Sequence, residues 1–174
     1  MKNIRLLSAN AIVAAIYTVL TFGFFFSFGP LQLRFSEALC LLCLFSLKFL
    51  PGLSVGCALS NVLGALIGVN PIGFIDSVVG TLATIIGCLG AYFIGRLMKG
   101  PALKLLLGAI PVILSNAVIV GLELMMIFSP TLEGFVLNSL LVGAGELCVL
   151  YTVGAFLFIL INKEERLKGF IESL

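Results

Sequence analysis

The segment SNAVIVGLELMM, residues 115–126, places an amide and a carboxylate inside a stretch apolar enough to span a membrane. Asn116 and Glu123 are seven positions apart, so they share one face of a helix. Ser139 and Glu146 share a face of the next apolar stretch in the same way. An ionisable residue within a spanning helix costs about 2.5–3.5 kcal/mol on insertion scales and usually faces a cavity or a partner. Glu123 and Glu146 are therefore candidate binding residues.

Other polar residues are candidates for the same site, each with a structural alternative. Asn61 lies midway along an apolar stretch, and Asn138 lies near the expected mouth of the cavity. Glu37 and Asp76 each stand where a helix is expected to begin, and an acid there also suits the helix dipole. Arg34 could pair with Glu37. Asn116 could instead hydrogen-bond a neighbouring helix.

Two unpaired carboxylates at this depth allow three explanations: they are protonated, they bind a cation, or they accept hydrogen bonds from a donor-rich ligand. A guanine-like edge carries adjacent ring and amino N–H donors that fit one carboxylate, and a ligand ammonium would suit another. At 1.5 Å per residue, Glu123 lies roughly 8 Å and Glu146 roughly 16 Å from the outer ends of their helices. A pocket that opens outward could reach both.

The elements that must position these groups are membrane helices. Of the 174 residues, 61% are hydrophobic and 10% are charged, far from the roughly 25% charged of a soluble domain. A spanning helix needs roughly 20 residues. The sequence therefore predicts an all-α integral membrane protein, a single domain over residues 1–174 with six transmembrane helices, near 7–28, 36–50, 52–69, 76–97, 104–128 and 135–161.

The orientation follows from the basic residues, which concentrate in cytoplasmic loops. Arg34 alone falls on the expected outer side. The other nine fall at the termini or in alternate connections, namely Lys2, Arg5, Lys48, Arg96, Lys99, Lys104, Lys163, Arg166 and Lys168. We expect both termini in the cytoplasm, and Glu123 and Glu146 without an internal basic partner.

Small residues recur every third or fourth position on three of the predicted helices, which lets helix backbones approach closely. Two stripes, expected to pack within the bundle, consist of Gly52, Gly56, Ser60, Gly64 and Gly68 and of Gly80, Thr84, Gly87, Ala91 and Gly95. Ser8, Ala11 and Ala15 line the first helix, where Ala11 and Ala15 form an AxxxA pattern. By itself the AxxxA suits internal packing and a subunit contact equally well.

The sequence indicates no enzyme. It has no histidine, no glycine-rich phosphate-binding loop of the ATPase type, and five cysteines scattered through apolar runs, where buried cysteine packs as a small hydrophobe. We expect no catalytic residue, no metal site, no cofactor and no nucleic-acid partner. Uptake against a gradient would need an ion or the ATPase of a partner.

Five blocks in order resemble the QueT family of queuosine-precursor transporters. They are GPLQLRFSEAL, PGLSVGCALSNVLG, DSVVGTLATIIG, PVILSNAVIVGLEL and VGAGELCVLY, within a resemblance that covers residues 8–160. The family is similar to the substrate-binding S-components of energy-coupling factor (ECF) transporters. The resemblance implies a six-helix subunit in the bacterial plasma membrane that captures a deazaguanine from outside: the aminomethyl form (preQ1), the nitrile form (preQ0) or queuine.

The same resemblance implies partners, a scaffold membrane subunit with two ATPase subunits. S-components present an AxxxA of helix one to the scaffold, so Ser8, Ala11 and Ala15 become the expected contact. Carried over by block, the expected substrate-binding residues are Glu37, Asp76, Asn116, Glu123 and Glu146, with Asn61 and Asn138 added from position. Three alternatives stay open: a standalone ion-coupled carrier with Glu123 and Glu146 as proton sites, an S-component for another flat heterocyclic vitamin, and a noncatalytic membrane scaffold.

Overall fold

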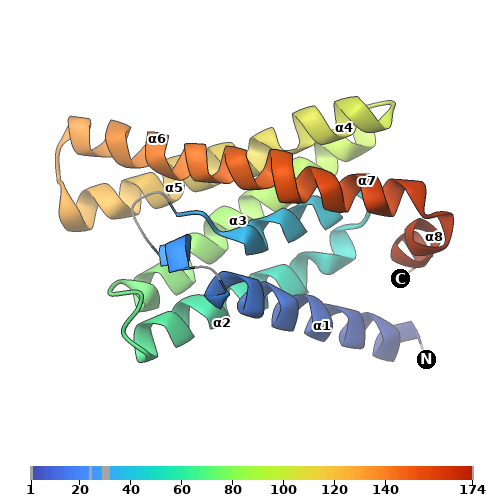
Figure 1. The fold of residues 1–174 in the computed structure, drawn as a ribbon, viewed down its shortest axis with the longest axis horizontal. Coiled ribbons are helices and arrows are strands. Elements are labelled where there is room, and N and C mark those ends of the chain that lie inside the picture. Colours follow the sequence, from blue (N-terminus) through green and yellow to red (C-terminus); the bar gives the residue numbers. More distant parts are fainter. Residues whose placement is uncertain (1, 24, 29–31, 174) are drawn as a thin grey trace.

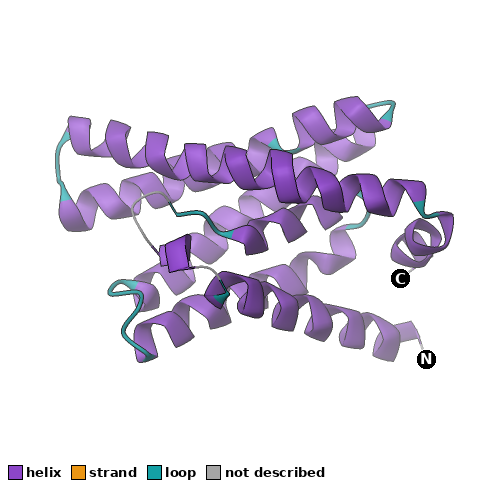
Figure 2. Cartoon of the chain, in the orientation of Figure 1, coloured by secondary structure: helices purple, strands orange, loops and turns teal. Residues whose placement is uncertain are grey.

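The computed structural model describes residues 2–23, 25–28 and 32–173, and over those ranges it contains helices and no strand (Figures 1 and 2). Elements η1 to η3 are 3-10 helices and η4 is a π-helical turn. In chain order the elements are α1 (Lys2–Phe22), η1 (Phe25–Phe28), η2 (Phe35–Leu44), η3 (Leu47–Phe49), α2 (Leu50–Leu66), α3 (Gly73–Leu97), α4 (Pro101–Gly108), α5 (Ile110–Phe128), α6 (Leu132–Val149), η4 (Leu150–Gly154), α7 (Ala155–Lys163) and α8 (Glu165–Ser173).

These elements run back and forth along one bundle axis, and both chain ends lie at the same end of the bundle (Figure 1). Within the described ranges, five segments are long and apolar enough to cross a membrane: Ile4–Phe22, Leu47–Leu66, Gly73–Leu97, Pro101–Phe128 and Leu132–Lys163. The structure therefore has the helical bundle that the sequence predicted, with five long apolar segments where six were expected.

The difference lies in the second predicted helix, 36–50. Its first part is the ten-residue 3-10 helix η2, which at about 2.0 Å per residue is roughly 20 Å long, less than the roughly 30 Å hydrocarbon core of a bilayer. Most of its residues are buried, and it contacts α1, α3 and η4. Irregular backbone is tolerated at membrane depth when protein surrounds it. This segment is thus an internal element of the bundle.

Other boundaries also differ from the prediction. The first helix ends at Phe22 rather than near 28. The predicted helix 104–128 is divided into α4 and α5 just before Pro111, which lacks an N–H donor and whose ring clashes with the preceding turn. The predicted helix 135–161 begins earlier, at Leu132, because the Thr131 hydroxyl accepts a hydrogen bond from Gly134 N at 3.0 Å. The π-helical turn η4 interrupts this helix at Leu150–Gly154, and α7 then continues it to Lys163.

The two glycine-rich stripes pack within the bundle, as predicted, except for Gly68, which lies beyond the end of α2 with nothing within 4 Å of an added Cβ atom. A Cβ atom added to Gly56 of α2 would lie 2.7 Å from the Cβ of Tyr17 on α1. A Cβ atom added to Gly87 of α3 would lie 2.8 Å from the Cα of Val112 on α5. Neither distance leaves room for a side chain, so glycine at these positions sets how closely the helices approach.

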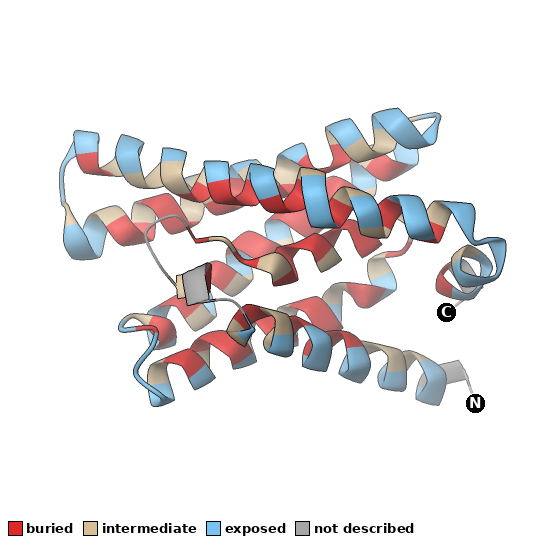
Figure 3. Ribbon diagram, viewed as in Figure 1, coloured by how far each residue is buried: buried red, intermediate tan, exposed pale blue. Residues whose placement is uncertain are grey.

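The outer faces of the long helices are exposed and apolar (Figure 3). Leu82 and Ile86 of α3 and Leu114 and Val118 of α5 are examples, each at least two-fifths exposed. A surface of this kind suits lipid rather than water. Four of the five cysteines are buried, all five are free thiols, and no cluster able to hold a metal ion occurs among the described residues.

Candidate substrate-binding site

A buried ion pair lies toward the end of the bundle opposite the chain termini. Arg34, in the loop before η2, contacts Asp76 in the first turn of α3, and their side chains are 5% and 1% exposed. Arg34 also donates from Nε to the backbone oxygen of Ser27 at 3.3 Å. Burial alone would lower the pKa of Arg34, but the Asp76 carboxylate and other nearby groups raise it above the ordinary value. The guanidinium is therefore a fixed positive charge.

Two asparagines extend this pair into a network. Asn70, in the turn between α2 and α3, donates to Asp76 Oδ2 at 3.1 Å and to Asn61 Oδ1 at 3.3 Å. Asn61 on α2 donates to the backbone oxygen of Asp76 at 3.2 Å. The predicted residues Asn61 and Asp76 are thus brought together, and the amides hold the carboxylate beside Arg34.

Glu37, in the first turn of η2, has a different set of partners. The Tyr17 hydroxyl of α1 donates to Oε1, the Cys40 thiol donates to Oε2 at 3.1 Å, and Thr84 of α3 donates to Oε1 at 3.5 Å. The possible pairing of Arg34 with Glu37 is wrong, because Arg34 reaches across to Asp76 on α3 instead. Glu37 joins three elements through hydrogen bonds.

Glu123 on α5 and Glu146 on α6 are buried, with 5% and 3% of their surface exposed. Among the residues that the structure describes, both carboxylate oxygens of Glu123 and the Oε2 of Glu146 are buried without a hydrogen-bond partner. Of the four predicted acids, Asp76 contacts Arg34, Glu37 has other partners, and Glu123 and Glu146 keep buried oxygens without one among the described residues.

The two remaining predicted site residues, Asn116 and Asn138, form hydrogen bonds outside this polar network. Asn116 Nδ2 donates to the Val112 backbone oxygen of its own helix at 3.2 Å. Asn138 Nδ2 donates to Ser129 Oγ at 3.2 Å, across the turn between α5 and α6. Both bonds hold local helix structure, and neither links the amide to the four acids.

Tyr17, Asn70 and Thr84 belong to the polar interior but were not among the predicted site residues. Thr84 was counted in a small-residue stripe, and Asn70 follows the end of the predicted helix 52–69. Tyr17 is fully buried although it lies in an apolar run, and a hydroxyl there needs an acceptor. That polarity was the one signal available in the sequence, but it does not identify the acceptor.

A cavity adjoins one of these acids, Glu123. Glu123 lines a cavity of about 310 Å³ between α3 and α5, whose other lining residues are apolar. Asp76 itself is tightly packed, since a Cβ atom added to Gly80 would lie 2.5 Å from Asp76 Oδ1. Asp76 Oδ1 also lacks a hydrogen-bond partner among the described residues.

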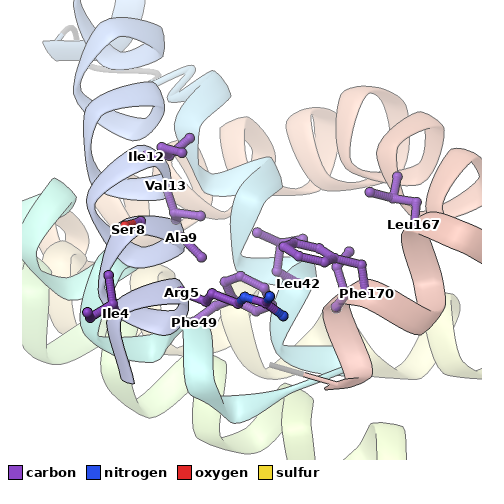
Figure 4. A pocket seen from close by; sticks show the side chains of 11 residues that line it. Ile4, Arg5, Ser8, Ala9, Ile12, Val13, Leu42, Phe49, Leu167 and Phe170 are labelled. Atoms are coloured by element: carbon purple, nitrogen blue, oxygen red, sulfur yellow. The ribbon is translucent and has the colours of Figure 1, made fainter. Parts of the chain in front are cut away.

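A second, apolar pocket of about 440 Å³ lies at the end of the bundle that carries the termini (Figure 4). Side chains of α1, η2, η3 and α8 line it, including Arg5, Ser8, Leu42, Phe49 and Phe170. None of its lining residues is acidic, so this pocket does not suit a donor-rich ring. The predicted contact residues Ser8, Ala11 and Ala15 are all exposed on α1.

Comparison with known proteins gives the family. A family model described as QueT transporter matches residues 7–163, which is most of the chain. The chain belongs to the QueT transporter family. Together with the long apolar helices, membership of the QueT family indicates a multi-pass membrane protein, and a transporter family implies a transport protein rather than an enzyme.

A relative in Lactococcus lactis subsp. cremoris (strain MG1363) carries the description queuosine precursor transporter QueT. It is 35% identical over 79 residues, which are 44% of this chain and 43% of the relative. The match thus spans less than half the length of that protein. No solved structure matches the chain.

Proposed function

We propose that this QueT family member is the substrate-binding subunit of an ECF-type transporter and captures a queuosine precursor of the deazaguanine class from outside the cell. Family membership and the description of the Lactococcus relative support the substrate class. The expected partners are a scaffold membrane subunit and two ATPase subunits that supply the energy.

One observation carries the proposal: buried carboxylate oxygens of Asp76, Glu123 and Glu146 lack hydrogen-bond partners among the described residues. An unsatisfied buried acceptor costs about 1–3 kcal/mol, and more when charged. A deazaguanine presents ring and amino N–H donors that satisfy such oxygens. Asn61 and Asn70 add amide groups that can form hydrogen bonds with the polar edge of a ring.

Charge distribution supports an outward-facing site in the bacterial plasma membrane. Apart from Arg34, the basic residues belong to the termini and to the connections at the end of the bundle where both termini lie. Basic residues of this kind favour the cytoplasmic side. With the termini in the cytoplasm, the four acids lie toward the outer half of the bundle. A ligand then enters from outside, as nutrient capture requires.

The exposed face of α1 supports a partner contact. Ser8, Ala11 and Ala15 present small side chains on the surface, and Ser8 also lines the apolar pocket of Figure 4. Small residues allow a partner helix to approach closely, and the pocket can receive an apolar side chain from it. This geometry suits a scaffold subunit that docks at the cytoplasmic half of α1.

The first experiment measures binding. Purified protein in lipid nanodiscs is titrated calorimetrically with aminomethyl deazaguanine, nitrile deazaguanine and queuine, with riboflavin and a pterin as other flat heterocycles. We expect at least one deazaguanine to bind with a single site, and the other heterocycles not to bind. Binding of a vitamin in place of every deazaguanine would favour the alternative S-component specificity.

A second experiment separates an ECF subunit from a standalone ion-coupled carrier, an alternative favoured by the buried acids Glu123 and Glu146. Uptake into proteoliposomes is measured with and without the scaffold and ATPase subunits. We expect ATP-dependent uptake with the partner subunits present, and we expect Ala11→Leu to abolish this uptake while the affinity for substrate stays unchanged.

Ala58→Leu, at a half-buried position of α2, serves as the control substitution and should keep the uptake. Uptake by the chain alone, driven by a pH gradient, would refute the subunit proposal.

A further inference from the structure

The apolar pocket of Figure 4 lies apart from the buried acids and shares no lining residue with the cavity beside Glu123. Its volume of about 440 Å³ lies within the roughly 300–1,000 Å³ that is typical of small-molecule sites. Its lining residues are apolar except for Arg5 and Ser8. Ile4 and Ile12 of the lining are exposed, so the pocket opens at the surface of α1. An occupant of this pocket needs a large apolar part.

The position of Arg5 along α1 corresponds to the headgroup region of a bilayer. The apolar part of α1 runs from Ile4 to Phe22, a length of 19 residues. At 1.5 Å per residue this segment is roughly 28 Å long, close to the thickness of the hydrocarbon core. Arg5 stands at the start of the segment, at the depth of lipid phosphates. Val13, also in the lining, lies roughly 12 Å farther along α1, at the depth of the acyl chains.

The two polar residues of the pocket are hydrogen-bond donors that suit a phosphate. Arg5 and Ser8 are three positions apart on α1, so they share one face of the helix. Arg5 is exposed, and it has no ion-pair partner among the described residues. A guanidinium can donate two parallel hydrogen bonds to a phosphate, and a serine hydroxyl can donate another. The pocket therefore offers a phosphate contact beside an apolar space.

Helix α8 forms the side of the pocket opposite α1. Leu167, Phe170 and Ile171 line the pocket from one face of α8, and Figure 4 shows Phe170 extending from α8 toward α1. A short helix with one apolar and one charged face is typical of the membrane interface. Residues 163–168 contain three basic and two acidic side chains, none of which lines the pocket. Arg5 therefore provides the charge of the pocket itself.

We propose that an anionic phospholipid occupies this pocket in the free subunit, with an acyl chain against the apolar lining and its phosphate bound by Arg5 and Ser8. The opening at the surface of α1 faces the bilayer, which supplies lipid directly. A zwitterionic lipid is a poorer match, because its headgroup brings an ammonium close to the guanidinium. An apolar side chain of a docked scaffold would need the same space, so lipid and scaffold exclude each other at this pocket.

The test titrates the full chain in mild detergent with phosphatidylglycerol and phosphatidylcholine of identical acyl chains, and native mass spectrometry counts the lipids retained. We expect the first phosphatidylglycerol to bind roughly fivefold more tightly, the effect of one basic residue near an anionic lipid. Arg5→Gln should lower that ratio to near one. Arg96→Gln, an exposed arginine in the last turn of α3 and outside the pocket lining, is the matched control and should keep the ratio.

A second variant tests the place of the acyl chain. Ala9→Phe fills part of the pocket from its half-buried wall and should weaken the first binding event of both lipids about tenfold. Should Ala9→Phe fail to fold, Ile12→Trp fills the mouth of the pocket from a more exposed position. Glycerol phosphate, which carries the phosphate without the chains, should not displace the bound lipid.

Four results would overturn the proposal. Equal affinity of the wild-type protein for both lipids, or a ratio unchanged in Arg5→Gln, would show that Arg5 does not select the phosphate. Unchanged lipid binding in the pocket-filling variants would place the acyl chain elsewhere. Displacement by glycerol phosphate would indicate a site for a soluble phosphate compound. A lipid-free dimer would indicate that a second copy of the chain covers the pocket.

Discussion

The two sides of the buried polar site differ in how their carboxylates are satisfied. On the α1, α2 and α3 side, Asp76 contacts Arg34 and receives a hydrogen bond from Asn70, and Glu37 receives hydrogen bonds from three side chains. On the α5 and α6 side, Glu123 has no hydrogen-bond partner for either oxygen among the described residues. On the first side the protein itself supplies partners for every carboxylate oxygen except Asp76 Oδ1, whereas the second side leaves both oxygens of Glu123 and Oε2 of Glu146 free for a ligand.

This difference predicts which substitutions affect folding and which affect binding. A buried acid whose partner is removed becomes an uncompensated charge, so changes on the paired side should destabilise the protein. Removing an acid that has no partner relieves an existing cost, so changes on the unpaired side should spare stability and reduce affinity. Variants on the two sides should therefore differ in their free energy of unfolding.

The largest effect is expected for Arg34→Gln. It leaves Asp76 buried without its cation and should lower the free energy of unfolding by about 3–5 kcal/mol. Chemical denaturation in mixed micelles measures this. In the double variant Arg34→Gln, Asp76→Asn, most of the loss should be recovered, because no lone charge remains. A single variant as stable as the wild-type protein would show that the pair does not hold the fold.

Gly80→Ala should have the next largest effect. The new Cβ atom would lie 2.5 Å from Asp76 Oδ1 and would push the carboxylate away from Arg34. Overpacking of this kind costs about 1–3 kcal/mol. Gly169→Ala in α8 is the matched control, since nothing lies within 4 Å of its added Cβ atom. Equal unfolding free energies for the two variants would contradict the tight packing around Asp76.

Glu146→Gln tests the unpaired side. It removes a buried carboxylate whose Oε2 has no partner, so the free energy of unfolding of the ligand-free protein should stay the same or rise by about 1 kcal/mol. Affinity for the aminomethyl deazaguanine should fall roughly tenfold. Denaturation and calorimetry on the same preparation measure both. A clear loss of stability would instead show that the Glu146 carboxylate helps to hold the fold, as Asp76 and Glu37 do.

The smallest effect is expected for Asn138→Ala, a residue outside both sides. Its side chain is partly exposed and makes one hydrogen bond, to Ser129 at 3.2 Å. The unfolding free energy should change by about 0.5 kcal/mol and affinity should not change. Loss of binding in this variant would show that Asn138 takes part in substrate binding, as the sequence analysis predicted.

Much of this architecture follows from local properties of the chain. Helical spacing made Asn116 and Glu123 share a face, apolar runs separated by glycine and proline gave most of the long helices, and Gly56 and Gly87 marked close helix contacts. The sequence also left Glu123 and Glu146 without a basic neighbour, since nine of the ten basic residues fall elsewhere along the chain. These features depend on period, composition and order alone.

The tertiary structure decided which faces meet. Arg34 contacts Asp76, 42 residues away, and not the nearby Glu37, while Tyr17 and Thr84 reach Glu37 from separate helices. It also decided that residues 35–44 form an internal 3-10 helix, because the surrounding helices bury them. The helical period fixes each helix face, but pairing between faces depends on how distant segments cross and pack. The local sequence does not encode that crossing by itself.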